Sequence, residues 1–479
     1  MNAATEVNPL APWACQLPPD WACCRLDAVA DVLFSNVDKH TLDGETPVRL
    51  CNYVDVYKND RITSAIDFME ASAEPREIAK FQIRRGDVLA TKDSETPDDI
   101  AVPAFVGEGL PGVLCGYHLA LIRPRSQRIC GAFLFWLHAS KPFRAQYEAK
   151  AVGVTRFGLS QYAFRELLIA LPPLPEQERT AAYLDASCAA IDAAVAAKRS
   201  QLDTLDALRK SIIQRAVTRG ISARVALEST GNAWMEQIPR GWKLVCLKRI
   251  AEIQGGLTLG KQYEGPLIER PYLRVGNVQD GHLDLVDVSL IELPASVAAT
   301  VELRPDDVLM TEGGDLDKLG RGYLWKGEIP GCLHQNHIFA VRCVLHKLKP
   351  MFLAYVTAAK YGRDYFEATG KKTTNLACTN ATKVGEFPIP LPPLTLQEAI
   401  CVHLDEKLGE LQRIVTGIES QIATLDAYRK SLIHECVTGQ RRVTEADVAR
   451  SKLSENIGQL NLEPSAKTVQ TEDVPHSVG

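Results

Sequence analysis

Two long stretches of the chain carry apolar residues at alternating spacings of four and three. One follows Leu171-Pro172-Pro173-Leu174, and the other follows Leu391-Pro392-Pro393-Leu394, 220 residues later. The apolar positions of the first are Leu184, Cys188, Ile191, Val195, Leu202, Leu205 and Ile212, and those of the second are Leu404, Leu408, Leu411, Val415, Ile418, Ile422, Leu425 and Leu432. A period near 3.5 residues is typical of paired helices. We therefore predict two helices of about 60 Å packed against each other; the alternative, that each helix only covers its own domain, does not require so long a seam.

The helical stretches belong to a tandem duplication with a period of about 220 residues, which sets the domain count before any other argument. Matching text includes Gln177-Glu178 and Gln397-Glu398, Thr204-Leu205-Asp206-Ala207 and Thr424-Leu425-Asp426-Ala427, and Arg209-Lys210-Ser211 and Arg429-Lys430-Ser431. A W-x4-P-x2-W pattern opens each repeat, at Trp13, Pro18 and Trp21 and at Trp234, Pro239 and Trp242. We predict that these tryptophans pack in the core.

The remainder of each repeat reads as mixed α/β. Short runs after turn residues, such as Val88–Thr91 and Val308–Thr311, predict strands. Phe133–Leu137 and Phe352–Val356 predict helices. Residues 220–234 read as a linker, and the polar stretch 441–479 is predicted to be disordered.

Composition places the chain among ordinary globular proteins, with 46% hydrophobic and 24% charged residues. It lacks the ~20-residue apolar run of a membrane span and a secretory signal. Thirteen cysteines without a C-x-x-C pair predict reduced thiols, and thus a cytoplasmic protein.

The net charge of −5 hides two basic segments at the same place in the two repeats. Arg123, Arg125, Arg128, Lys141, Arg144, Lys150, Arg156 and Arg165 fall within 121–165, opposed there only by Glu148; Arg342, Lys347, Lys349, Lys360, Arg363, Lys371, Lys372 and Lys383 fall within 342–383. Because phosphate contacts supply most sequence-independent affinity, the pattern predicts one DNA-binding basic face per domain. A solvated helix face is the alternative.

Base readout is expected from loops that differ between the copies. The base-reading candidates in the first repeat are Asn59, Lys92, Asp93, Ser94, Tyr117 and Arg156, and those in the second are Lys261, Gln262, Arg274, Asn277, Asp315, Lys318, Gln335, Asn336 and Lys372. Arg144, Lys150 and Lys371 are further DNA-binding candidates from the basic segments. His118 and His337 occupy matching positions, which favours a shared structural role over catalysis or metal binding.

Enzyme motifs are weak throughout the chain. No [DNS]-P-P-[YF] motif or glycine-rich methyl-donor loop is present. Gly255–Lys261 approaches a phosphate loop, but Gln262 stands where Ser or Thr would hold magnesium. Asp98 and Glu148 are too far apart in sequence to suggest a nuclease with Lys150. We therefore expect no catalytic residue, no metal site and no cofactor in this chain.

The order of these parts resembles the specificity (S) subunit of type I restriction–modification systems. The L-P-P-L blocks, the T-L-D-A-x-R-K-S blocks, the tryptophan patterns and the G-x5-L segments Gly153–Leu159 and Gly370–Leu376 carry the resemblance. It implies an α+β protein with two mixed α/β target recognition domains, joined by two long helices packed as an antiparallel coiled coil with a pseudo-twofold internal repeat. The implied boundaries are 1–170 and 221–390 for the recognition domains, 171–220 and 391–440 for the spacer helices, and 441–479 for the tail.

The resemblance also implies a function and partners. Each recognition domain would read one half of a bipartite site in double-stranded DNA. The helices, with the seam residues listed above, would set the spacing and dock two modification (methyltransferase) subunits, and two motor-nuclease subunits would complete the restriction enzyme. S-adenosylmethionine, ATP and Mg would belong to those partners. The second block departs from the family pattern, because Leu396 stands where the first has Glu176. A type IIB-like system, a self-sufficient enzyme subunit and a structural adaptor are the alternatives.

Overall fold

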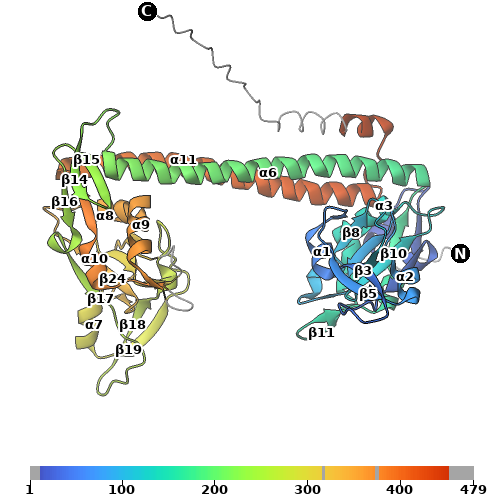
Figure 1. The fold of residues 1–479 in the computed structure, drawn as a ribbon, viewed down its shortest axis with the longest axis horizontal. Coiled ribbons are helices and arrows are strands. Elements are labelled where there is room, and N and C mark those ends of the chain that lie inside the picture. Colours follow the sequence, from blue (N-terminus) through green and yellow to red (C-terminus); the bar gives the residue numbers. More distant parts are fainter. Residues whose placement is uncertain (1–10, 315–318, 373–376, 452–479) are drawn as a thin grey trace, which may run out of the picture. The chain divides into compact units, whose positions relative to one another are not determined.

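The structure, a computed structural model, describes residues 11–314, 319–372 and 377–451 (Figure 1). The chain divides into two compact units. Unit 1 contains Met1–Lys198 and Ser420–Gly479, and unit 2 contains Arg199–Glu419. Each unit therefore combines one sheet-rich domain with half of each long helix.

The sheet-rich part of unit 1 is built around one mixed five-stranded sheet. Its strand order is β2 (Ala30–Phe34), β10 (Leu119–Pro124), β6 (Val88–Thr91), β8 (Pro103–Val106) and β4 (Arg61–Ile62). Three smaller sheets contain β5 (Met69–Ala73), β3 (Thr46–Cys51) and β9 (Val113–Cys115); β11 (Val152–Gly153), β12 (Phe157–Gly158) and β7 (Asp93–Ser94); and β1 (Ala22–Arg25) with β13 (Leu168–Leu171). The helices are α1 (Tyr53–Lys58), α2 (Pro75–Phe81), α3 (Gly131–Ala139), α4 (Lys141–Glu148) and α5 (Gln161–Arg165), with 3-10 turns η1 (Pro12–Gln16), η2 (Leu26–Ala28) and η3 (Pro97–Asp99).

Unit 2 has a similar topology, but in the described residues its main sheet has four strands and lacks a counterpart of β4. The main sheet has the order β17 (Ala251–Gly255), β24 (Ile338–Cys343), β20 (Val308–Thr311) and β22 (Gly322–Leu324). The smaller sheets contain β19 (Ser289–Leu293), β18 (Ile268–Leu273) and β23 (Leu333–His334); β21 (Gly313–Gly314), β26 (Ala377–Cys378) and β25 (Lys371–Lys372); and β16 (Lys243–Cys246) with β27 (Pro388–Leu391). The helices are α7 (Ala295–Val301), α8 (Pro350–Ala358), α9 (Lys360–Thr369) and α10 (Ala381–Glu386), with η4 (Leu247–Arg249) and η5 (Val275–Asn277). The predicted helices at 133–137 and 352–356 are confirmed as parts of α3 and α8.

The long helices are α6 (Leu174–Arg219) and α11 (Leu394–Val437). In unit 1 the first half of α6 packs against the last half of α11, and Arg429 forms an ion pair with Asp192 at 3.0 Å. In unit 2 the last half of α6 and the first half of α11 line one cavity. The two helices therefore run in opposite directions within each unit. The predicted coiled coil is confirmed.

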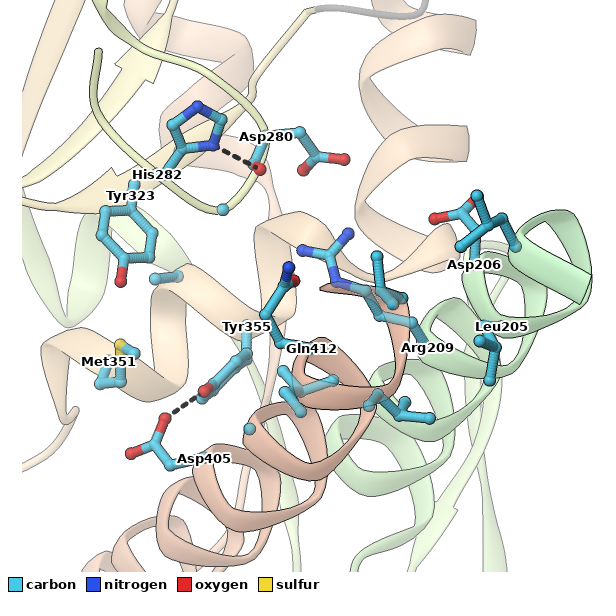
Figure 2. Close-up of a pocket in the computed structure, with 18 of the residues that line it drawn as sticks. Leu205, Asp206, Arg209, Asp280, His282, Tyr323, Met351, Tyr355, Asp405 and Gln412 are labelled. Atoms are coloured by element: carbon cyan, nitrogen blue, oxygen red, sulfur yellow. Dashed lines mark hydrogen bonds between the residues drawn. The ribbon is translucent and has the colours of Figure 1, made fainter. Parts of the chain in front are cut away.

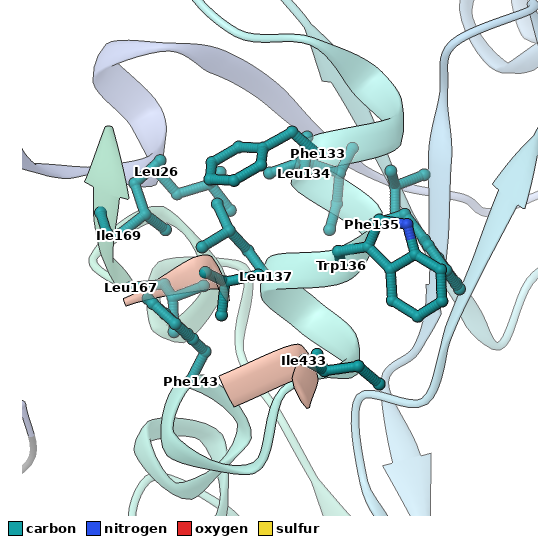
Figure 3. Packing of buried hydrophobic residues seen from close by; sticks show 14 of the residues in the cluster. Leu26, Phe133, Leu134, Phe135, Trp136, Leu137, Phe143, Leu167, Ile169 and Ile433 are labelled. Carbon is teal, nitrogen blue, oxygen red and sulfur yellow. The ribbon is translucent and has the colours of Figure 1, made fainter. Parts of the chain in front are cut away.

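Each domain core continues into both helices. In unit 1, Phe133 and Leu137 of α3 belong to one buried cluster with Leu184 of α6 and Ile433 of α11 (Figure 3). The equivalent cluster of unit 2 contains Phe352. It also contains two groups of helix residues that are buried, namely Ile213, Ala216 and Val217 from α6 and Ile400 and Leu404 from α11. Burial of these clusters is the main force that holds the helix halves to their domains.

The tryptophan patterns meet the ends of the long helices. Gly220 follows α6 with φ +77°, and Gly439 follows α11 with φ +76°. Glycine adopts this left-handed conformation without the steric cost that other residues bear. A Cβ on Gly220 would lie 3.4 Å from the Trp242 ring, and one on Gly439 would lie 3.4 Å from the Trp21 ring. The second tryptophan of each pattern therefore covers the end of a long helix.

Three sequence expectations need correction. The predicted linker contains a hairpin of β14 (Leu227–Asn232) and β15 (Met235–Pro239). Trp234 lies at the turn of this hairpin, packs against Tyr365 and is 39% exposed, so it is not a core residue. Trp13 is buried as predicted. The start of the predicted disordered tail is folded: 445–451 is helical and Val443 is buried. Burial of Val443 and the ion pairs of Arg442 with Asp20 and Glu176 attach this segment to unit 1. Residues 452–479 lie outside the described part.

Candidate nucleic-acid interface

A small three-stranded sheet carries the divergent loops of each unit. In unit 1, β7 begins two residues after the central strand β6 ends, and it pairs with β12 of the β11–β12 hairpin. In unit 2, β21 follows β20 in the same way and pairs with β26. β11 projects from the body of unit 1 in Figure 1, and Val152 and Val154 are exposed there. These sheets place variable side chains at the end of a buried, shared strand.

Asp93 organises the candidate site of unit 1. Its Oδ2 lies 2.7 Å from Nδ1 of His118, and its Oδ1 accepts a hydrogen bond of 2.6 Å from Arg156. Asp93 is largely buried, at 15% side-chain exposure, whereas Arg156 is 59% exposed. The hydrogen bond with Asp93 raises the pKa of Arg156. The carboxylate thus holds one nitrogen of the Arg156 guanidinium, while much of the side chain stays exposed to solvent.

Lys92 and Tyr117 complete this cluster. The Lys92 ammonium lies 4.4 Å from the centre of the Tyr117 ring and 5.2 Å from that of Phe34, within cation–π range. Tyr117 also packs edge-on against His118 and is half exposed. Burial lowers the pKa of Lys92. Lys92, Asp93, Ser94, Tyr117 and Arg156 are therefore five predicted residues that the structure brings together.

The histidine–carboxylate pair recurs in unit 2 with a different acid. Nδ1 of His337 lies 3.0 Å from Oε2 of Glu312. The Glu312 amide donates to the His337 carbonyl at 2.9 Å, as the Lys92 amide does to His118 at 3.3 Å. Glu312 therefore occupies the backbone position of Lys92, not that of Asp93. At one shared place, unit 1 presents an ammonium and unit 2 a carboxylate.

Three other candidates of unit 1 lie away from this cluster. Asn59 donates to the Asp55 carbonyl at 2.8 Å and closes the end of α1. Arg144 donates to the carbonyls of Asp98 and Ile100, and Lys150 pairs with Glu166 at 3.4 Å. These contacts hold loops and helix ends of unit 1 together.

The candidates of unit 2 are more scattered. Lys261, Gln262 and Lys371 are exposed, and Gln335 and Asn336 are half-buried. Arg274 pairs with Asp287 at 2.6 Å. Asn277 is buried, and its side chain accepts from the Arg274 amide and donates to the carbonyls of Asp284 and Asp287. These bonds give Asn277 a structural role in this loop, and its role as a base reader stays a prediction. Asp315 and Lys318, and the side chain of Lys372, lie outside the described part.

The prediction of one basic face per domain stays a prediction, but the structure shows how the cations are paired. Most cations of the two segments form ion pairs within the chain. In unit 1 these pairs are Arg123–Asp87, Arg125–Asp31, Lys150–Glu166 and Arg156–Asp93; in unit 2 they are Arg342–Asp307, Lys349–Glu398, Lys360–Asp364, Arg363–Asp280 and Lys383–Glu386. Lys360–Asp364 and Lys383–Glu386 are local pairs. Pairs such as Arg123–Asp87 and Arg363–Asp280 use carboxylates from distant parts of the sequence, which a charge count along one segment leaves out.

Comparison with known proteins bears on what this arrangement is. No family model matches the chain. It is 26% identical over 204 residues to a putative type I restriction enzyme MjaX specificity subunit of Methanocaldococcus jannaschii, a match covering 42% of this chain and 47% of that relative. It is 21% identical over 334 residues to the type I restriction enzyme EcoKI specificity subunit of Escherichia coli, covering 69% and 68%. The chain thus matches about half the length of the first relative.

Solved structures agree in fold. A chain from a study of complex assembly and conformational transition of the type I R-M system aligns with a TM-score of 0.65 and 20% identity, over 88% of this chain and 98% of that chain. The HsdS subunit of Thermoanaerobacter tengcongensis aligns with a TM-score of 0.50, 20% identity and coverage of 89% and 98%. This chain is therefore similar in sequence to type I specificity subunits and shares the fold of these solved structures.

The motifs that recur between the two repeats have a structural explanation. Gln177, three residues after the first L-P-P-L block, accepts from the Cys130 amide and donates to the carbonyls of Arg128 and Pro172. Gln397 makes the same three bonds in unit 2, with Lys349, Lys347 and Pro392. Both glutamines are buried. The repeated glutamine therefore clamps the start of each long helix to its domain.

The difference between the two blocks, Leu396 in place of Glu176, is explained by the contacts of Glu176. Its carboxylate accepts from Trp21 Nε1 at 3.2 Å and from Arg442, which follows α11. The residue 220 positions before Arg442 is Ser222, so unit 2 lacks the cation at that place. A glutamate at position 396 would therefore lack an arginine partner, which explains why the second repeat has Leu396 there.

Three further findings concern metal sites, membrane spans and cysteines. Within the described ranges, no group of three or more His, Cys, Asp or Glu side chains is arranged to hold a metal ion. Among the helices of the described residues, none combines the length and apolarity needed to cross a membrane. All thirteen cysteines are free thiols.

Proposed function

We propose that this chain is the sequence-specific DNA-binding subunit of a type I restriction–modification enzyme. Unit 1 and unit 2 each read one half of a bipartite site. The chain itself carries no catalytic residue, and adenine methylation and cleavage are performed by its partner subunits.

The observation that carries this proposal is the pairing of a repeated frame with divergent loop chemistry. The two units share the order of four strands in the main sheet, the order of three smaller sheets and the glutamine clamps. They differ where β7 and β21 begin, with Lys92, Asp93 and Arg156 in unit 1 and Glu312 in unit 2. Different donors and acceptors on equivalent supports favour different base sequences.

The paired helices supply the rest of the proposal. α6 and α11 set the spacing between the half-sites and dock two modification subunits, and two restriction subunits join the full complex. S-adenosylmethionine, ATP and Mg are then cofactors of the partners. The similarity to named specificity subunits supports this assignment.

Methylome sequencing of the host tests the proposal. We expect N6-methyladenine in a split motif with two specified halves, and its loss when the gene for this chain is deleted. Unchanged adenine methylation in the deletion strain would contradict the proposal. As a control, the chain restored from a plasmid should return the same motif.

A further inference from the structure

Unit 2 contains a cavity of about 760 Å³ between α8 and the two long helices (Figure 2). α8 contributes Ala354 and Tyr355, α6 contributes Arg209, and α11 contributes Asp405. The loop after η5 closes one side with Asp280 and Gly281. The Tyr355 hydroxyl donates a hydrogen bond to Asp405 at the wall of the cavity.

The same place in unit 1 is filled by an arginine. The Arg61 guanidinium binds Asp185 of α6 and lies over three aromatic rings, 4.6 Å from the centre of Phe135, 5.0 Å from Phe105 and 5.7 Å from Trp136. Trp136 Nε1 donates to the same Asp185 oxygen at 2.8 Å. Unit 1 thus shows a guanidinium held between a helix carboxylate and aromatic faces.

The residues of the two places correspond one by one. Asp185 and Asp405 occupy equivalent positions in the long helices, and each accepts from the equivalent aromatic residue, Trp136 in α3 or Tyr355 in α8. Phe135 of α3 corresponds to Ala354 of α8. Loss of the larger rings opens the space in unit 2.

The arginine itself is replaced by glycine. Asp60 and Arg61 lie beside Arg429, which donates to Asp60 at 3.1 Å. In unit 2 the equivalent arginine is Arg209, and a Cβ on Gly281 would lie 2.7 Å from its guanidinium. Asp280-Gly281 therefore stands where unit 1 has Asp60-Arg61.

The cavity of unit 2 lacks an arginine equivalent to Arg61, but its lining remains rich in carboxylates. Its lining includes four carboxylates, of Asp206, Asp280, Asp405 and Glu419, and one guanidinium, of Arg209. Asp206 pairs with Lys210 and Asp280 with Arg363. In the described part of the chain, the cation that holds Asp185 has no counterpart at Asp405.

We propose that this cavity receives the guanidinium of an arginine side chain from a partner polypeptide, held at Asp405 beside Tyr355 as Arg61 is held at Asp185 in unit 1. A planar guanidinium suits a carboxylate and an aromatic face together, whereas an ammonium is more strongly hydrated. The choice of a polypeptide as the source rests on the proposed docking of partner subunits on α6 and α11. The guanidinium chemistry rests on the cavity and its filled counterpart alone.

The test is a titration of the full chain, labelled with 13C at the methionine methyls, followed by NMR. Met351 lines the cavity and reports on unit 2, and Met69 in β5 reports on unit 1. The probes are Ac-Gly-Arg-Gly-NH2, Ac-Gly-Lys-Gly-NH2 and methylguanidinium. We expect the arginine peptide to shift the Met351 signal saturably and to leave the Met69 signal unchanged. The lysine peptide should shift the Met351 signal little.

Three variants sharpen the test. Asp405→Asn, which still accepts from Tyr355, should weaken arginine binding by about ten-fold or more because a charged acceptor is lost. Ala354→Phe, which restores the ring of unit 1, should fill the cavity and abolish binding. Arg61→Ala should create a second guanidinium site at Asp185. Each variant's folding is checked by its methyl spectrum before titration.

Several outcomes would overturn the inference. Equal binding of the lysine and arginine peptides would reject guanidinium selectivity, and unchanged affinity in Asp405→Asn would reject the proposed site. Binding of methylguanidinium without binding of the peptide would reject a polypeptide source. Because the titration uses no DNA, failure of the proposed DNA recognition would leave its result unchanged.

Discussion

Unit 1 and unit 2 form the same side-chain bonds at positions that hold each domain together, and they differ at positions whose partners are present in only one unit. Asp87 is 2% exposed and accepts from Arg123 and from the Arg84 amide; Asp307 does the same with Arg342 and the Arg304 amide. In each pair the aspartate also binds a backbone amide and the arginine also binds a backbone carbonyl. These pairs recur unchanged because they join backbone segments that both domains share.

The differing positions depend on partners that only one unit has. Glu176 accepts a hydrogen bond from Arg442, and unit 2 has no arginine at the matching position. Arg61 lies over the Phe135 ring, which is Ala354 in unit 2. Buried His138 corresponds to Thr357. The comparison teaches that duplication preserved the bonds that define the domain. Side chains that bond only to a local feature changed together with that feature.

The largest expected effect concerns the buried ion pairs. Asp87→Ala should cost unit 1 about 3–5 kcal/mol because Arg123 would remain largely buried without its partner. Asp307→Ala should cost unit 2 a similar amount. Hydrogen-exchange mass spectrometry reads the opening free energy of peptides from each unit separately. A large loss in only one of the two variants would break the claim of a shared frame.

The glutamine clamps should have a smaller but again matched effect. Gln177→Ala would leave the Cys130 amide and two buried carbonyls without their bonds, at a cost of about 2–3 kcal/mol. Gln397→Ala should cost the same in unit 2. The same exchange measurement, on peptides at the start of α6 and α11, gives both values. Exposed Gln201 of α6, replaced by Ala, is the matched control, and it should change neither.

His138 should make unit 1 sensitive to acid. Burial lowers its pKa to about 4, below the value of about 6.5 in an unfolded chain. The neutral ring therefore contributes full stability above pH 6.5, and this contribution is lost as the pH falls towards 4. Between pH 7 and pH 5 the loss is about 2 kcal/mol.

The variant His138→Thr carries the residue of unit 2 and removes this titration. We expect the variant to lose about 2 kcal/mol less than the wild type between pH 7 and pH 5, by urea unfolding at each pH. Parallel pH profiles of the two proteins would show that His138 does not titrate as its burial predicts.

The smallest expected effect is at Glu176. Glu176→Leu, which copies Leu396, should cost about 1 kcal/mol, because Arg442 is half exposed and can return to water. Arg442→Ser copies Ser222 and should cost less once Glu176 is gone, because only its pair with Asp20 is then left to lose. A double-mutant cycle on the opening of unit 1 measures this coupling. Full additivity would show that the two residues act independently.

The repeat and its periodic helices made much of the fold predictable from sequence. The spacing of Leu184, Ile191 and Val195 reports a buried seam directly, because helical geometry converts sequence spacing into a shared face. The hairpin at β14–β15 was missed because its residues are polar and lack alternation. The folded segment at Arg442 was missed because its partners, Asp20 and Glu176, are distant in sequence.

The candidate site was predictable only in part. Lys92, Asp93, Tyr117 and Arg156 stood out as polar residues in divergent loops, and the sheet β7–β12 brings them together. Glu312 was missed, although its position directly after β20, matching that of Lys92 after β6, was a usable signal. The charge of 121–165 was overestimated because ion pairs such as Arg123–Asp87 join segments that no local count connects.

The most direct test of the central claim, two different readers on one repeated frame, is an exchange of the first domain. Residues 13–170 are replaced by the equivalent domain of another specificity subunit with a known motif, keeping α6 and α11, and the methylome of the host is sequenced. We predict that one half of the methylated motif changes to that of the donor while the other half and the spacer length stay the same. A motif in which both halves change, or neither does, would contradict the account.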